Sequence, residues 1–425
     1  MSMRLDLWTA GALLLSATAQ AAPAHAAAVV GPARLGTYIG GGLGLYAPAE
    51  VWKNDAARTR ELGVGAVRFN SDVWDLLEPS RFDYRWEKLD AAVETMTAAG
   101  LEPLFTLPIS NKWNGAGKAI KVSGFDIGPT HFPTRDLAGV RALAKTIASR
   151  YRTKIKYYEV WNEPDFALFW KGEPNASEYL DLLREAYMGL KEGNPQAVVL
   201  LGGLAKPKET EWLDKLLALG GGKFFDVMNL HVYPAFATLE EALGVSRGVM
   251  LRHKASKPIW ITETSTTGWY FETSNRDKEE SAKAAYVLKT FASALSQADV
   301  ERVFWHTLRN PGKDVGFSRD LDFGLMTSDG APLPAHRALR AFNRLLKGSV
   351  PQGRVERPGL EIYPFEDKNR RVEVLWSRKG TIDYRVPSGY KTARRLSLYG
   401  EEQHEPGLPG SIAVTEEPSY LELSK

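Results

Sequence analysis

The sequence predicts an α/β protein, a (β/α)8 TIM barrel followed by a small C-terminal β-sandwich domain. Between residues 35 and 347, short apolar runs alternate with amphipathic segments eight times, which favours a parallel sheet with helical crossovers. The chain has 425 residues, more than the roughly 250 of a single barrel. From residue 348 onward, short alternating runs such as 372–376 and 382–386 replace the helical pattern. We therefore expect the barrel at 35–347 and the β-sandwich at 348–425.

The first 26 residues are expected to be a signal peptide outside the fold. Arg4 precedes an apolar stretch, and Ala19-Gln20-Ala21 and Ala24-His25-Ala26 are typical cleavage sites. Because Asp6 offsets Arg4, an uncleaved N-terminal anchor stays an alternative. No other run approaches the ~20 apolar residues of a membrane span. The expected location is the bacterial periplasm or the extracellular space.

The composition excludes several classes of function. It is that of an ordinary globular protein, with 44% hydrophobic and 25% charged residues. A formal net charge of +3 without a long basic run argues against a nucleic-acid partner. The chain has no cysteine, which excludes disulfides, thiolate metal sites and cysteine nucleophiles. Metal-binding and phosphate-binding motifs are also absent, so we expect no metal or cofactor and a chemistry that comes from side chains. The chain is also expected to be a monomer.

Eight apolar runs are the expected barrel strands. They lie at residues 35–38, 66–69, 104–107, 157–160, 198–201, 227–230, 259–261 and 303–305. The segments between them have helical spacing, for example at 137–147 and 282–291. In such a barrel the loops after the strands build the active site.

Two glutamates lie at the ends of expected strands. Glu163 follows the run at 157–160, and Pro164 stops strand pairing there because it has no N–H. Glu263 follows the run at 259–261 in the same way. Carboxylates from two strand ends can face one another across a cleft, as glycoside hydrolysis requires. The alternative is that each glutamate is only a solvated loop residue, but the occurrence of both makes this pair the candidate catalytic residues.

These motifs resemble those of retaining (β/α)8-barrel glycosidases, in particular glycoside hydrolase family 39. The resemblance rests on Trp161-Asn162-Glu163-Pro164 and the later Ile261-Thr262-Glu263. The family signature has Trp and Phe where this chain has Lys156 and Tyr158. The resemblance implies that Glu163, after the fourth strand, is the acid/base and that Glu263, after the seventh, is the nucleophile.

Other strand ends carry groups suited to a sugar. Arg68 ends the second strand, where it can orient a carboxylate or a hydroxyl, or simply form an ion pair at the barrel rim. The resemblance implies that Asn162 binds the sugar 2-hydroxyl and that Tyr233 donates a hydrogen bond to Glu263. His231 lies on the same strand face as Tyr233, so it is a further candidate for substrate contact, with a structural role as the alternative.

Aromatic residues are candidate binding walls for sugar rings. By resemblance, Trp305 at the end of the eighth strand is a stacking platform, with a buried core tryptophan as the alternative. Seven aromatic residues fall in loops after the third, fourth and seventh strands: Trp113, Phe166, Phe169, Trp170, Trp269, Tyr270 and Phe271. They are expected to line subsites, or else to pack the loops.

The sequence thus predicts a retaining glycoside hydrolase that acts on an oligo- or polysaccharide. Burial should raise the pKa of Glu163, while Tyr233 and Arg68 should keep Glu263 ionised. The signal peptide, the small β domain and the aromatic loops favour the family members that cleave bacterial exopolysaccharides internally. An exo-acting, β-xylosidase-like enzyme is the alternative. A glycan-binding barrel protein without turnover is the alternative from another class.

Overall fold

The computed structural model describes residues 28–39, 48–69, 74–107, 110, 113–114, 120–122, 125–127, 132–171, 173–267, 275–310, 322–403 and 410–425. The expected signal peptide therefore lies outside the described residues, as do Trp269, Tyr270 and Phe271. Within the described part of the chain, every helix is too short or too polar to cross a membrane.

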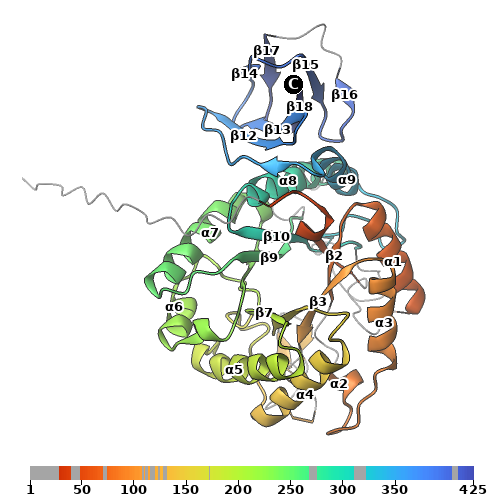
Figure 1. The fold of residues 1–425 in the computed structure, drawn as a ribbon, viewed down its shortest axis with the longest axis vertical. Helices are drawn as coiled ribbons and strands as arrows, with labels where there is room; N and C mark the ends of the chain where they lie inside the picture. The colour runs from red at the N-terminus through yellow and green to blue at the C-terminus, as the bar shows by residue number, and fades with distance from the viewer. Residues whose placement is uncertain are drawn as a thin grey trace, which may run out of the picture.

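Eight parallel strands form the predicted barrel (Figure 1). They are β1 (Leu35–Tyr38), β2 (Ala66–Phe69), β3 (Glu102–Leu107), β6 (Tyr157–Val160), β7 (Val198–Leu200), β8 (Met228–Val232), β9 (Ile259–Thr264) and β10 (Val300–Trp305). The order in the sheet is β7-β6-β3-β2-β1-β10-β9-β8. Parallel bridges from Leu200 to Val227 and from Leu204 to Leu230 connect its two edges. The predicted fold class is confirmed.

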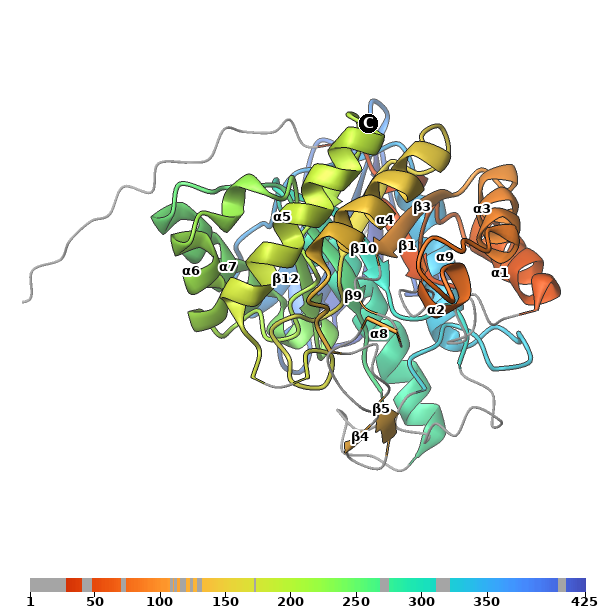
Figure 2. The same ribbon diagram turned by 90° about the horizontal axis from the view of Figure 1, so that it is seen from below.

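Helices surround the strands, as Figures 1 and 2 show. They are α1 (Ala49–Glu61), α2 (Trp74–Leu77), α3 (Glu87–Ala98), α4 (Leu137–Arg150), α5 (Ala176–Gly193), α6 (Glu211–Ala218), α7 (Ala235–Arg252), α8 (Arg276–Leu295) and α9 (Pro334–Leu346). The helical patterns predicted at 137–147 and 282–291 lie in α4 and α8. The loop after β3 contains a hairpin that was not predicted, made of β4 (Ile120–Val122) and β5 (Phe125–Ile127).

Side chains close the barrel at the N-terminal ends of its strands. The Arg302 guanidinium lies between the rings of Tyr157 and Trp260, 4.3 and 4.4 Å from their centroids. It also forms an ion pair of 2.7 Å with Glu102. Leu104, Trp260 and Phe304 belong to one buried apolar cluster inside this end of the barrel. Glu163, which follows β6, and Glu263, near the last residue of β9, lie at the opposite ends of their strands.

The C-terminal region consists of antiparallel strands. They are β11 (Val350–Pro351), β12 (Leu360–Glu366), β13 (Arg370–Ser377), β14 (Ile382–Arg385), β15 (Thr392–Leu396), β16 (Glu402–Gln403), β17 (Ser411–Val414) and β18 (Ser419–Ser424). Six of them form one sheet, and β14 with β17 forms a second that packs on it through a cluster including Ile362 and Ile412. Trp376 of β13 contacts Phe236 of α7, with ring centroids 5.4 Å apart, so this region shares a core with the barrel.

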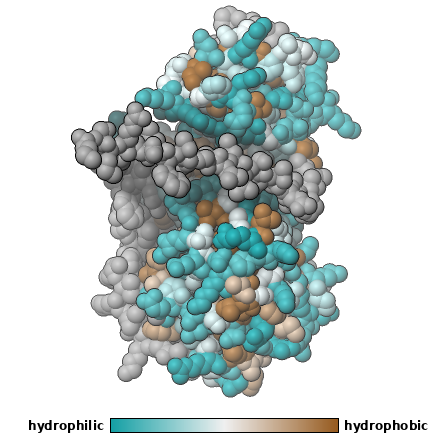
Figure 3. All heavy atoms as spheres, turned by 90° about the vertical axis from the view of Figure 1, so that its left-hand side faces the viewer, coloured by the Kyte–Doolittle hydropathy of each residue, from teal (hydrophilic) through white to brown (hydrophobic). Residues whose placement is uncertain are grey.

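The surface is mixed in character. On the face that Figure 3 displays, hydrophobic residues form small groups separated by hydrophilic ones. Five large hydrophobic residues are exposed among those described, and they lie in separate segments of the chain: Val29, Phe82, Met188, Leu219 and Leu251. Scattered exposure of this kind is normal for a globular protein.

Candidate active site

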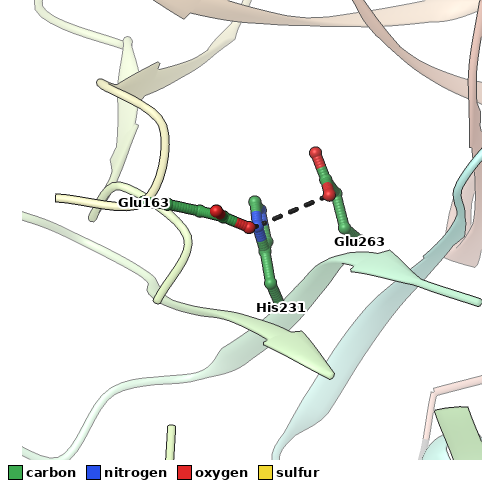
Figure 4. A group of neighbouring side chains, drawn as sticks. All are labelled: Glu163, His231 and Glu263. Carbon is green, nitrogen blue, oxygen red and sulfur yellow. Dashed lines mark hydrogen bonds and ion pairs between the residues drawn. The ribbon is translucent and has the colours of Figure 1, made fainter. Parts of the chain in front are cut away.

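The turn after β6 directs Glu163 toward the other site residues. Trp161 and Glu163 have φ angles of 73° and 49°, in the left-handed region that side chains other than glycine rarely adopt. Such strain persists only where the surrounding structure imposes it, and it is frequent at functional sites. Here the Glu163 N–H donates to the Gly203 carbonyl at 3.2 Å. Glu163 consequently faces Glu263 and His231, which come from neighbouring strands (Figure 4).

The two candidate catalytic carboxylates are close together. One oxygen of each, together with a ring nitrogen of His231, lies within a group whose atoms are all within 4.8 Å of one another. Both residues are buried, Glu163 being 8% and Glu263 9% exposed. Retaining glycosidases separate their carboxyl groups by about 5–5.5 Å and inverting ones by about 6.5–9.5 Å. An oxygen–oxygen approach within 4.8 Å is closer to the spacing of the retaining class than to that of the inverting class.

Glu263 is surrounded by groups that favour its ionised form. Arg68 Nη1 donates to Glu263 Oε1 at 2.5 Å, and the Tyr233 hydroxyl donates to Oε2 at 2.9 Å, the contact that the family resemblance implied for Tyr233. Burial opposes ionisation, but electrostatic attraction to His231, His306 and Arg68 and the Tyr233 hydrogen bond outweigh it. They hold the pKa of Glu263 well below its usual range. Glu263 therefore stands as a carboxylate ready to act as a nucleophile.

The pKa of Glu163 is shifted in the opposite direction to that of Glu263. Burial raises its pKa, and the negative charge of Glu263 adds to that effect, although the His231 hydrogen bond opposes it. His231 Nδ1 lies 2.8 Å from Glu163 Oε1 and 3.6 Å from Glu263 Oε2. Burial would lower the pKa of His231, but the Glu263 charge and contacts with Glu159 and Glu163 raise it to about 10. The pKa values of the two glutamates thus diverge, as a proton donor paired with a nucleophile requires.

Glu159 is a central residue that the sequence analysis missed. It is completely buried, and its carboxylate accepts hydrogen bonds from Arg68 Nε at 2.6 Å and Nη2 at 3.1 Å. The Asn229 side-chain amide and the Gly203 N–H also donate to it, both at 3.0 Å. A signal was present, since a glutamate inside an apolar strand needs a buried partner. His306 was also missed, and its Nδ1 lies 3.9 Å from Glu263 Oε1.

The structure places the remaining candidates in different surroundings. Asn162 Oδ1 accepts from Arg68 Nη2 at 2.8 Å, so it belongs to the same network. Trp305 is fully buried, and its indole N–H donates to the Phe323 carbonyl at 3.0 Å. Trp113 donates to the Glu78 carbonyl at 2.8 Å, a hydrogen bond outside this network. Trp305 is therefore a buried core tryptophan, the alternative considered for it, and the sugar contacts of Asn162, His231 and Trp113 stay predictions.

Two of the loop aromatics pack together and one belongs to the core. The rings of Phe166 and Phe169 lie 6.3 Å apart. Trp170 is 1% exposed and packs between Trp161 and Tyr179, with centroid distances of 5.7 and 6.0 Å. Trp170 is therefore loop packing, the alternative considered for these residues.

One group among the described residues has the composition of a metal site. It consists of Glu163, His231 and Glu263. To bind a metal ion, His231 would have to be neutral, whereas its pKa is raised to about 10. The cation of Arg68 also already contacts Glu263. The chemistry of the group suits proton transfer better than metal binding, and the absence of a metal stays a prediction.

Comparisons with known proteins find similarity to glycoside hydrolases. The family model described as "Glycosyl hydrolase catalytic core" matches residues 134–332, and one described as "Beta-galactosidase" matches residues 46–109. A beta-xylosidase from Caldicellulosiruptor saccharolyticus is 24% identical over 359 residues, which cover 77% of this chain and 69% of the relative.

Solved structures share the fold. A family 39 glycoside hydrolase from Bacteroides cellulosilyticus superposes with a TM-score of 0.71 at 21% identity, covering 94% of this chain and 82% of that one. A family 39 enzyme from Xanthomonas axonopodis has a TM-score of 0.63 at 18% identity, covering 94% and 96%. Together with the catalytic-core match and the similarity to a glycosidase over most of the chain, these findings show that the protein is a glycoside hydrolase with the fold of family 39 enzymes.

Proposed function

We propose that the chain hydrolyses a glycosidic bond by double displacement, with Glu263 as nucleophile and Glu163 as acid/base. In the first step a Glu263 oxygen bonds to the anomeric carbon, the glycosidic C–O bond breaks, and Glu163 gives its proton to the leaving oxygen. In the second step Glu163 takes a proton from water, the water oxygen bonds to the anomeric carbon, and the bond to Glu263 breaks. The configuration at that carbon is retained.

One observation carries this proposal. Glu163 and Glu263 lie close enough for the retaining mechanism, and their surroundings shift their pKa values in opposite directions. A solvated pair of loop carboxylates would be neither buried nor differentiated in this way. The non-catalytic alternative is set aside because the chain is a glycoside hydrolase.

For the substrate, we propose a bacterial exopolysaccharide that an exported enzyme cleaves internally. The N-terminal segment supports export, because it has the charge and apolar pattern of a signal peptide. Half-buried aromatic side chains on loops after β3 and β6 support a polymer cleft, because rings on these loops can stack on sugar rings: Trp113, Phe166 and Phe169.

A second candidate is exo-acting hydrolysis of a β-xyloside. The similarity to a beta-xylosidase favours it, since that similarity extends over 77% of this chain. An exo-acting enzyme releases monosaccharides from chain ends, whereas an endo-acting one releases oligosaccharides, so product size separates the two.

The test is release of reducing ends from a panel of bacterial exopolysaccharides and β-linked glycans by the chain without residues 1–26. Glu263→Gln is the matched control, because it keeps the shape of the side chain and removes the nucleophile. We expect oligosaccharides with the wild type only, and proton NMR of the first product should show the anomer of the substrate. Monosaccharides alone would support the exo-acting candidate, and the inverted anomer would refute double displacement.

A further inference from the structure

His306 carries a polar atom that the site described so far does not use. It follows Trp305 at the end of β10, and its Nδ1 is buried. Among the residues that the structure describes, no donor or acceptor lies within hydrogen-bonding distance of this nitrogen. The side chain as a whole is 26% exposed, so the ring borders open space and is not sealed in the core.

The neighbours of His306 hold its ring beside the nucleophile. Its centroid lies 5.2 Å from that of Tyr38 and 5.8 Å from that of Phe323, so aromatic rings pack against it on two sides. Nδ1 is 3.9 Å from Glu263 Oε1, too far for a hydrogen bond. Oε1 itself already accepts from Arg68.

The imidazole is suited to an uncharged partner. Burial lowers the pKa of His306, which favours the neutral ring despite the nearby carboxylate. In a neutral imidazole one nitrogen donates and the other accepts, so Nδ1 can bind a hydroxyl in either sense. A buried polar atom without a partner costs free energy, and a ligand that supplies one recovers it.

We propose that His306 is a substrate-binding residue whose Nδ1 hydrogen-bonds a ring hydroxyl of the sugar that Glu263 attacks. The inference rests on the proposed function, because it takes Glu263 as the nucleophile. The bound sugar stands against Glu263, whose Oε1 lies 3.9 Å from Nδ1, and the exposed part of the His306 side chain borders the same region, so a rotation of the imidazole brings Nδ1 to a sugar hydroxyl. His306 then discriminates between sugars by the presence and position of that hydroxyl.

Two variants separate this role from simple packing. His306→Phe keeps a ring against Tyr38 and Phe323 but removes the polar atom. His306→Asn places an amide atom close to the position of Nδ1 and loses part of the ring. If the hydrogen bond matters, His306→Phe lowers kcat/KM by about 10- to 100-fold, and His306→Asn recovers part of that loss. If packing alone matters, His306→Asn is the more damaged variant.

The probes are 2,4-dinitrophenyl β-xyloside and β-glucoside, each with its 3-deoxy and 4-deoxy analogues. On the wild type, removal of the contacted hydroxyl from the substrate should lower kcat/KM by about the same factor as the His306→Phe substitution does with the full substrate. On His306→Phe, removal of the same hydroxyl should lower kcat/KM little further, because both changes remove the same interaction. If every deoxy analogue loses the same factor in kcat/KM on His306→Phe as on the wild type, the proposal is overturned.

A parallel labelling experiment distinguishes failure of this inference from failure of the proposed function. The 2-deoxy-2-fluoro forms of the same glycosides should form a covalent adduct on Glu263 that mass spectrometry detects. If the wild type forms the adduct, but each deoxy analogue loses the same factor in kcat/KM on His306→Phe as on the wild type, the proposed role of His306 is refuted and the proposed function stands. No adduct and no hydrolysis by the wild type with either sugar series refutes both proposals for these glycosides.

Discussion

Arg68 and Glu263 form an ion pair of 2.5 Å between β2 and β9, and Glu159 binds the same guanidinium through Nε and Nη2. One cation is thus shared between the proposed nucleophile and a carboxylate that is fully buried. Because Glu159 contacts two of the guanidinium nitrogens, it determines where Nη1 meets Glu263. Glu159 is therefore a positioning residue, although it is not placed to touch substrate.

Glu159→Gln should lower both stability and activity. The change keeps the shape of the side chain but leaves Arg68 with one carboxylate fewer in a buried site. Loss of one member of a buried ion pair costs about 3–5 kcal/mol. We expect the free energy of unfolding in urea to fall by roughly that amount, and kcat to fall because Glu263 is less well aligned.

Glu94→Gln is the matched control for this change. Glu94 pairs with Lys154 on the surface, where both side chains are largely exposed. Exposed pairs contribute about 0–1 kcal/mol, so this variant should be close to wild type in both measurements. Equal unfolding free energies for the two variants would mean that the ion pair between Glu159 and Arg68 does not stabilise the fold as proposed.

Glu163→Ala should be far more harmful to substrates with poor leaving groups. An oligosaccharide leaving oxygen needs a proton, whereas 2,4-dinitrophenolate leaves without one. General acid catalysis contributes about 10²- to 10⁴-fold, so kcat/KM for oligosaccharides should fall by that factor more than for the aryl glycoside. Steady-state kinetics with both substrates measure the difference. A uniform loss across leaving groups would show that Glu163 is not the proton donor.

The strand pattern of the barrel and the placement of its two glutamates were predictable from the sequence. Each barrel strand lies within a few residues of an expected apolar run, because a buried parallel strand must be apolar along its length. Strands of one sheet end at the same face of a barrel, so Glu163 and Glu263 could be expected to meet there without knowledge of the contacts between them.

The network behind those glutamates was not predictable from local patterns. Glu159 and Arg68 are 91 positions apart, and only the pairing of β2, β3 and β6 brings them together. The position of His306 likewise depends on how the end of β10 meets β1. Burial of loop aromatics is also a tertiary property, so the sequence could not distinguish Trp170, which packs in the core, from residues that border a cleft.

Gly203→Ala should reduce activity more than stability. A Cβ at this position would lie 2.1 Å from His231 Nε2, so the imidazole or the backbone has to move. Movement of the ring would break its contacts with Glu163 and Thr262, at 2.8 and 3.1 Å. A displacement of about 1 Å in an active site can cost roughly 10²-fold in rate. We expect a loss of kcat of that order, measured together with the melting temperature.

Gly248→Ala controls for the effect of adding a methyl group. Gly248 lies within α7, and a Cβ there would meet no atom within 4 Å. Alanine is favoured over glycine in a helix by about 0.5–1 kcal/mol, so this variant should be slightly more stable and fully active. If Gly203→Ala behaves in the same way, the close approach to His231 has no functional role.

His231→Asn should shift the whole pH profile of kcat/KM to higher pH. The pKa of His231 is about 10, so it is a cation at neutral pH, and its charge lowers the pKa of both Glu163 and Glu263. Asparagine can keep a donor near the position of Nδ1 without the charge. Activity requires Glu263 ionised and Glu163 protonated, so it falls at low pH through the pKa of Glu263 and at high pH through that of Glu163.

Removing the cation raises both pKa values, and the acidic and alkaline limits of activity therefore both move upward. Tyr233→Phe is the matched comparison, because it removes only an uncharged hydrogen bond, from Glu263 Oε2. That change should raise the pKa of Glu263 and move the acidic limit, while the alkaline limit, which belongs to Glu163, stays in place. An unchanged pH profile for His231→Asn would mean that His231 is neutral in the working enzyme. A shift of either limit of that profile to lower pH would contradict a positive charge on His231 beside the two glutamates.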